Sequence, residues 1–181
     1  TTMGKIIGGG LPVAAFGGRS DVMELLDPRR SPSLAQGGTY NGNPLGMAAG
    51  VAAMRELTPD VYEDLNRKGE RVKDQLSEVF DSHGVAAQVN GVGSLLAVHF
   101  TDVAVTDYRS KATADERITR DFFLGLVNHG VLLAPRAMGA LSTPMGEEEI
   151  ERFVDAVDTT VGELKARWQP SAWTKRPPSS P

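Results

Sequence analysis

The chain has 181 residues, no cysteine and a formal net charge of −4 at pH 7. The lack of cysteine excludes disulfides and thiol nucleophiles, and the acidic balance gives no general affinity for nucleic acid or an anionic membrane surface. Hydrophobic residues make up 40% of the chain, as in a folded globular protein, but no apolar run reaches the roughly 18 residues that a membrane span needs. We therefore expect a soluble, cytoplasmic protein, and its three scattered histidines predict no metal site.

The first third of the chain is rich in glycine and has little regular structure. Its predicted elements are a buried strand in 11–18, helices in 19–28 and 44–57, and a loop in 29–44. Ser20 and Asn43 are the predicted N-caps, and Pro44 occupies the first position of the second helix. One strand and two helices cannot bury a core alone, which indicates the C-terminal part of a longer polypeptide.

The rest of the chain has the pattern of a compact α+β domain with a small antiparallel or mixed sheet. Its predicted elements are a helix in 60–80, strands in 85–91 and 94–100, a helix in 114–130, a strand in 131–135, a loop in 136–144 and a helix in 146–168. We accordingly divide the chain into segments 1–57 and 58–167 and a disordered tail, 168–181.

Lys5 stands directly before a run of three glycines, in the sequence GKIIGGG. A P-loop is excluded because Ile6 occupies the place of the required Ser or Thr, and a dinucleotide fingerprint is excluded because Val13 replaces its last glycine. The open alternatives are a surface lysine beside a flexible turn and a lysine packed between Met3, Ile6 and Ile7. Partial burial among these apolar neighbours would suit the amine to form a Schiff base.

Three motifs in order along the chain resemble class III, fold type I aminotransferases that depend on pyridoxal phosphate. They are GKIIGGGLPVAAFGGRSDVM, GGTYNGNPLGMAAGVAAM and NHGVLLAPRAMGALSTP. The resemblance is to the branch that includes glutamate-1-semialdehyde aminomutase, and within it to the aromatic β-amino acid aminotransferases. It implies an α/β fold, with 1–57 as the end of the large cofactor-binding domain and 58–167 as the small C-terminal α+β domain.

The resemblance also implies roles for individual residues. Lys5 would hold the cofactor as a Schiff base and act as general base, and Thr39 and Gly38 would bind its phosphate. In the family, this threonine reaches into the neighbouring subunit of a homodimer. The family's first phosphate loop, ring-stacking aromatic and pyridine-nitrogen aspartate have no counterpart here, so we expect them in a preceding part of the polypeptide.

Arg136 is the predicted substrate-binding residue. An arginine at this position is either a solvated side chain or a fork for a substrate carboxylate. Aminomutases of the branch carry a glutamate three residues later, where this chain has Gly139. The motif is more similar to that of the β-phenylalanine aminotransferases, so Met138 and Ala140 would line the apolar side of the substrate pocket.

Three functional hypotheses follow. The first is transfer of the amino group from a β-amino acid, of the aromatic type, to a 2-oxo acid by a ping-pong mechanism. The second is intramolecular amino transfer of the glutamate-1-semialdehyde 2,1-aminomutase type, which needs no external acceptor. The third is a non-catalytic fragment or binding module.

Overall fold

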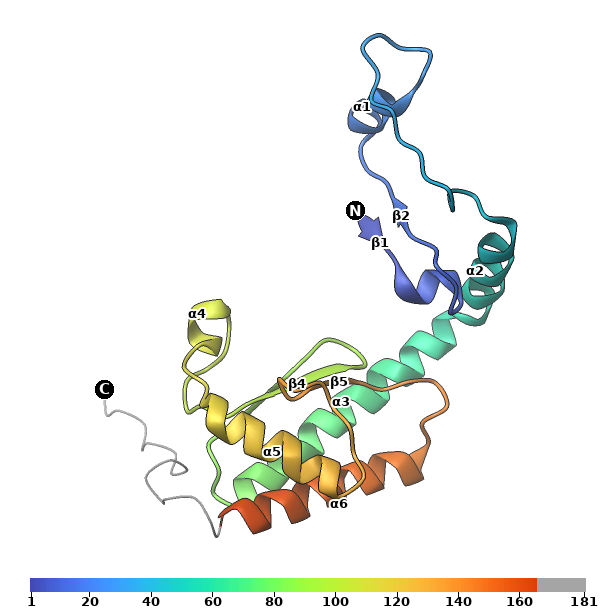
Figure 1. The fold of residues 1–181 in the computed structure, drawn as a ribbon. Helices are drawn as coiled ribbons and strands as arrows, with labels where there is room; N and C mark the ends of the chain where they lie inside the picture. Colours follow the sequence, from blue (N-terminus) through green and yellow to red (C-terminus); the bar gives the residue numbers. More distant parts are fainter. Residues whose placement is uncertain (166–181) are drawn as a thin grey trace. The chain divides into compact units, whose positions relative to one another are not determined.

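The computed structural model describes residues 1–165, which divide into two compact units, Thr1–Val61 and a second unit that begins at Tyr62 (Figure 1). The predicted tail 168–181 and the end of the helix predicted in 146–168 lie outside the described residues. Among the described residues, no helix is long and apolar enough to cross a membrane. In the same part of the chain, no group of three or more His, Cys, Asp or Glu side chains could hold a metal ion.

The first unit is built from short elements and one longer helix. Its elements are β1 (Thr2–Met3), η1 (Lys5–Gly8), β2 (Ala15–Phe16), α1 (Ser20–Met23), η2 (Glu24–Leu26) and α2 (Pro44–Glu56). Strands β1 and β2 pair antiparallel. No hydrophobic side chain of residues 1–61 is buried, so this unit has no core of its own.

Helix α2 packs against η1 through the backbone. A Cβ on Gly50 would lie 2.6 Å from the carbonyl oxygen of Ile7, and one on Gly9 would lie 2.6 Å from that of Ala49. Real Cβ atoms do not approach so closely, so both positions require glycine. The predicted cap of α2 is confirmed, because the Asn43 side chain accepts a 3.0 Å hydrogen bond from the backbone N–H of Gly46.

Two predictions for the first unit are wrong. The strand predicted in 11–18 is reduced to Ala15–Phe16, and both residues are exposed because nothing in this unit covers β2. Ser20 is the first residue of α1 and not its cap; Arg19 takes the cap position and makes no side-chain cap bond.

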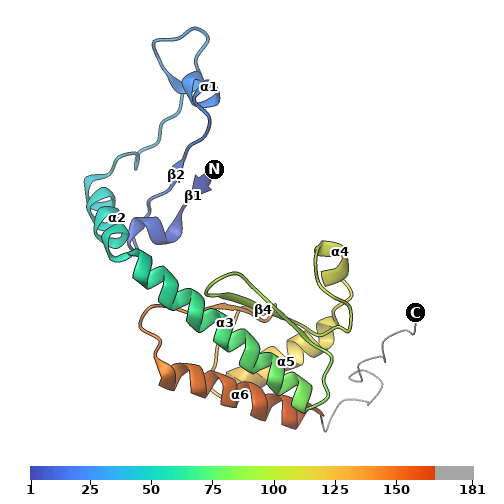
Figure 2. The same ribbon diagram turned by 180° about the vertical axis from the view of Figure 1, so that it is seen from behind.

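The second unit is a layer of three helices on a three-stranded antiparallel sheet. Its elements are α3 (Pro59–Ser82), β3 (Gln88–Asn90), β4 (Leu95–His99), α4 (Tyr108–Lys111), α5 (Glu116–Asn128), β5 (Met138–Ala140) and α6 (Glu147–Lys165), with strand order β3-β4-β5. Figures 1 and 2 show α3, α5 and α6 on one side of the sheet. Helix α3 begins three residues before the division between the units.

The core lies between this helical layer and one face of the sheet. Strand β4 alternates strictly, so that Leu96 and Val98 are buried while the residues between them are less so. Below the strand, Phe80, Phe100 and Phe122 form a cluster whose ring centroids lie 5.1 to 6.0 Å apart, mostly edge to face. Among the described residues, α3, α5 and α6 do not extend over the other face of the sheet.

The strand predicted in 131–135 is wrong, and part of the predicted loop forms β5 instead. Residues Met138–Ala140 take the place beside β4, with Ala97 opposite Met138. Segment 131–135 contributes a single bridge, from Ala134 to Met138. The strands predicted in 85–91 and 94–100 are confirmed as β3 and β4, which pair antiparallel with Val89 opposite Val98.

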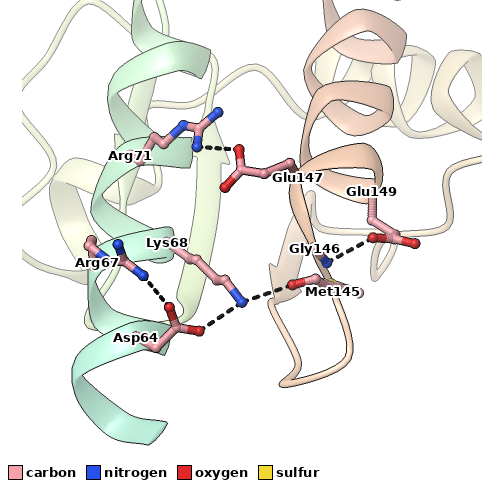
Figure 3. A network of polar contacts seen from close by, with 8 residues as sticks. All are labelled: Asp64, Arg67, Lys68, Arg71, Met145, Gly146, Glu147 and Glu149. Atoms are coloured by element: carbon pink, nitrogen blue, oxygen red, sulfur yellow. Dashed lines mark hydrogen bonds and ion pairs between the residues drawn. The ribbon is translucent and has the colours of Figure 1, made fainter. Parts of the chain in front are cut away.

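A polar network ties the segment that precedes α6 to helix α3 (Figure 3). The Lys68 ammonium lies 2.7 Å from the Asp64 carboxylate and donates a 3.0 Å hydrogen bond to the carbonyl of Met145. Arg71 pairs with Glu147 at the first turn of α6. The hydrogen bonds from Lys68 and Arg67 lower the pKa of Asp64 below its ordinary 3.8, which keeps this carboxylate charged at neutral pH.

Candidate active site

Lys5 occupies a strained backbone position at the start of η1. Its φ is 57°, in the left-handed region that non-glycine residues seldom adopt. Among the described residues, Ala137 is the other non-glycine residue with positive φ, and it follows the predicted substrate arginine directly. Such strain persists where the surrounding structure enforces it and is concentrated at functional sites.

The expected packing of Lys5 between apolar side chains is wrong for the described chain. Lys5 is exposed, and so are its neighbours Met3 and Ile6, with Ile6 64% exposed. The reason is that η1 meets α2 through the backbone of Ile7 and Gly8, which leaves the side chains of Lys5 and Ile6 exposed. The space beside Gly9 is occupied by the backbone of α2, at Ala49.

Gly38 and Thr39 lie in a turn that offers hydrogen-bond donors. The carbonyl oxygen of Gly38 accepts a 3.0 Å hydrogen bond from the N–H of Asn41, which closes the turn. Among residues 1–165, the N–H groups of Gly38 and Thr39 and the Thr39 hydroxyl have no acceptor or donor partner. A phosphate dianion binds to free N–H and hydroxyl groups of this kind.

Arg136 is presented by a tight turn that reverses the chain into β5. The N–H of Ala137 donates to the carbonyl of Ala134 at 2.9 Å, and the N–H of Ala134 donates to Met138 at 2.8 Å. This is a three-residue hairpin loop, with Pro135 in the favoured first position and Ala137 in the left-handed conformation. Ala137 is fully buried, and its carbonyl accepts from Val98, so the turn is fixed to β4.

The predicted substrate residues line two different cavities. Arg136 lines a cavity of about 350 Å³ together with His99, Lys111 and Glu116. Met138 and Ala140 line another, of about 380 Å³, whose other lining residues include Leu133, Met145 and Phe153. The structure thus brings Met138 and Ala140 together, but it does not place them in the cavity of Arg136.

Sequence reasoning missed Lys111 and the short helix α4. Burial, together with the nearby positive charge of Lys111, lowers the pKa of His99 below its ordinary 6.5. His99 is therefore neutral near pH 7, and the charges on the cavity wall are those of Lys111, Arg136 and Glu116. The available signal was the capping pair at Asp107 and Ser110, three residues apart.

Comparison with known proteins shows the family. Residues 1–146 match the model of the class-III aminotransferases. The chain is 38% identical to the glutamate-1-semialdehyde 2,1-aminomutase 2 of Bacillus pumilus, over 91% of this chain and 38% of that protein. It is 40% identical to the beta-phenylalanine transaminase of Variovorax paradoxus, over 90% of this chain and 37% of that protein.

A solved structure agrees with these sequence matches. The fold superposes on the crystal structure of an omega-transaminase from Sphaerobacter thermophilus with a TM-score of 0.85 at 39% identity, covering 92% of this chain and 38% of that one. The chain therefore belongs to the class-III aminotransferases, enzymes that depend on pyridoxal phosphate. It spans under two fifths of the length of these relatives, and its fold is the corresponding part of a fold type I transferase.

We predict that Ala137→Gly changes the free energy of unfolding by less than about 1 kcal/mol. Relief of left-handed strain is worth roughly 1–2 kcal/mol, against about 0.8 kcal/mol for the lost burial of one methyl group and about 0.5–1 kcal/mol for the greater freedom of glycine in the unfolded chain. The matched control is Ala140→Gly in β5, which should lower stability by about 0.5–1 kcal/mol, as glycine does in a strand. Urea unfolding of the full chain measures both, and equal destabilisation by the two variants would contradict strain at Ala137.

Proposed function

We propose that this chain supplies the cofactor-binding lysine, part of the phosphate site and the carboxylate-binding arginine of an aminotransferase that acts on β-amino acids, of the aromatic type, with a 2-oxo acid as acceptor. The observation that carries the proposal is that the family match includes Lys5, the turn at Gly38 and Thr39, and Arg136. The strained backbone at Lys5 and beside Arg136 supports it independently.

The residues present fit the phosphate and aldehyde ends of pyridoxal phosphate. Lys5 offers an exposed amine, while Gly38 and Thr39 offer donors without partners in the described chain. When bound, this cofactor supplies an electron sink that stabilises a carbanion at the substrate carbon. Lys5 would hold it covalently through Nζ and, once released by the incoming substrate amine, use that nitrogen to move the proton of the reacting carbon.

Arg136 would fix the substrate by its carboxylate. A guanidinium binds a carboxylate through two parallel hydrogen bonds, which sets orientation as well as affinity. The short loop that carries Arg136 is hydrogen-bonded to β4 through Ala137, so the backbone that carries this guanidinium is fixed. Exposed Met138 and Ala140 offer apolar surface in a second cavity of the same unit, which suits an aromatic substituent.

Intramolecular amino transfer is the second candidate, because several relatives bear the name of a glutamate-1-semialdehyde aminomutase. Gly139 counts against it. A Cβ at this position would lie 2.8 Å from Leu133 Cδ2 and 3.8 Å from Leu96 Cδ1. A glutamate there would meet two leucine side chains, and burying its carboxylate among them without a partner is unfavourable.

The proposal includes the assembly and the domain organisation. We assign the first unit to the end of the large domain and the second to the small C-terminal domain of a cytoplasmic homodimer, in which Thr39 serves the neighbouring subunit. Support for a covering partner comes from exposed apolar residues of the first unit, such as Leu34, Leu45 and Tyr40, which are 61–70% exposed.

Replacement of Lys5 by Ala should abolish covalent retention of the cofactor. In the unaltered protein, borohydride reduction followed by peptide mass spectrometry should place the cofactor on Lys5, because Nζ is the attacking nitrogen. Lys165→Ala, at the end of α6, is the matched control and should retain the cofactor. If Lys5→Ala retained the cofactor on another lysine, the assignment of Lys5 as the cofactor-binding residue would be wrong. If no protein retained the cofactor, the non-catalytic hypothesis would be favoured.

Amino transfer from β-phenylalanine should depend on an added 2-oxo acid. With pyridoxal phosphate present, we expect the β-keto product to form only when 2-oxoglutarate or pyruvate is supplied, and Arg136→Gln to raise KM at least tenfold through loss of a charged pair. The two candidates are separated by supplying glutamate-1-semialdehyde alone. Its conversion without acceptor, with β-phenylalanine inert, would establish the aminomutase function instead.

Mixed dimers test whether Thr39 acts across the interface. Lys5→Ala and Thr39→Val subunits, each impaired alone, should recover activity when unfolded and refolded together. If Thr39 serves the neighbouring subunit, one site of each mixed dimer combines an intact Lys5 with an intact Thr39, whereas no site does so if Thr39 acts within its own subunit. If the refolded mixture forms dimers but recovers no activity, the crossed arrangement is contradicted.

A further inference from the structure

The segment between β4 and α5 is a long connection held in place by its own hydrogen bonds. The Asn90 side chain donates to the carbonyl of Val105 at 2.8 Å, and the hydroxyls of Thr101 and Thr113 lie 2.8 Å apart. The N–H of Asp115 donates to Phe100 at 3.0 Å, which closes the base of the segment. Connections of this length are longer than most in compact domains.

Helix α4 is the ordered centre of this segment and carries Lys111. The Asp107 carboxylate accepts a 2.7 Å hydrogen bond from the N–H of Ser110, and the Ser110 hydroxyl accepts a 3.0 Å bond from the N–H of Asp107. This capping box fixes a helix of four residues that has no apolar face of its own. Lys111 is half-buried at its end and lines the cavity of Arg136.

The cavity of Arg136 thus has a cation on each of two walls. Arg136 comes from the turn before β5, and Lys111 comes from α4. Among residues 1–165, neither is paired with a carboxylate. Glu116 is the one acid on the lining and His99 is uncharged near neutrality, so the two cations outnumber the acid.

We propose that Lys111 is a specificity-determining residue, which makes the cavity of Arg136 prefer small acids with two carboxylates over those with one. The guanidinium fork of Arg136 takes both oxygens of one carboxylate. Lys111 is a compact charge on a flexible stem, and it is left for a second carboxylate on the same molecule. A cavity of about 350 Å³ has room for such an acid.

This inference deepens the proposed function, because the dicarboxylic acid would be an amino acceptor. Its test measures binding and needs no turnover, so it is independent of whether the protein transfers amino groups. The probes are glutarate and butyrate, which have similar chains and differ in one carboxylate. Isothermal titration calorimetry of the full chain, at low ionic strength, measures both affinities.

Four variants complete the experiment, with circular dichroism as the check that each is folded. Lys111→Gln removes the second charge and Lys111→Arg retains it. Arg109→Gln is the matched control, because Arg109 belongs to the same helix but does not line the cavity. Arg136→Gln removes the first carboxylate site.

We expect glutarate to bind the unaltered protein at least tenfold more tightly than butyrate. Lys111→Gln should weaken glutarate roughly tenfold, the scale of one charged contact, and change butyrate less than twofold. Lys111→Arg and Arg109→Gln should keep the preference, and Arg136→Gln should weaken both acids. The proposal is overturned if Lys111→Gln loses affinity for both acids equally, if the unaltered protein shows no preference between them, or if glutarate does not bind.

Discussion

The alternation of β4 is the constraint on which the second unit depends. Leu96 and Val98 belong to the same buried core as Phe80, Phe100 and Phe122, and three helices cover that face of the sheet. Because successive strand residues face opposite ways, the same alternation places His99 on the face that these three helices do not cover. The turn of Arg136 is fixed to this strand by the bond from Val98 to Ala137. Packing energy on one side of the sheet therefore positions the polar groups on the other.

The two units obtain their order by different means. The second unit buries a set of large apolar side chains, whereas the first buries three glycines and no hydrophobic side chain. Contact between α2 and η1 is close, but it removes little apolar surface from water, so it contributes little hydrophobic stabilisation. The first unit instead leaves large apolar residues such as Leu34 and Leu45 exposed.

Where the sequence signals are local and strong, the structure was predictable. Asn43 and Pro44 specify the start of α2, and α5 ends at Asn128, two residues before Gly130, whose φ of 78° stops the helix near the end of the predicted range. The strand expected in 131–135 failed because an apolar run cannot show which segment pairs with β4, and the turn at Pro135 gives that place to Met138–Ala140. Helix α4 is set by capping alone and gives no periodic signal. Lys5 and Arg136 could be predicted as candidate site residues from sequence motifs. Lys111 could not, because only the folded chain brings it to the cavity of Arg136.

The contact of Gly50 and Gly9 with the opposite backbone has a mechanical consequence. Side chains at an interface can change rotamer and absorb a small displacement, whereas a carbonyl against a Cα has no such freedom. Helix α2 and η1 must therefore shift as a single body. A tilt of α2 would therefore be transmitted to η1 and to its first residue, Lys5, and would change the direction in which that amine points.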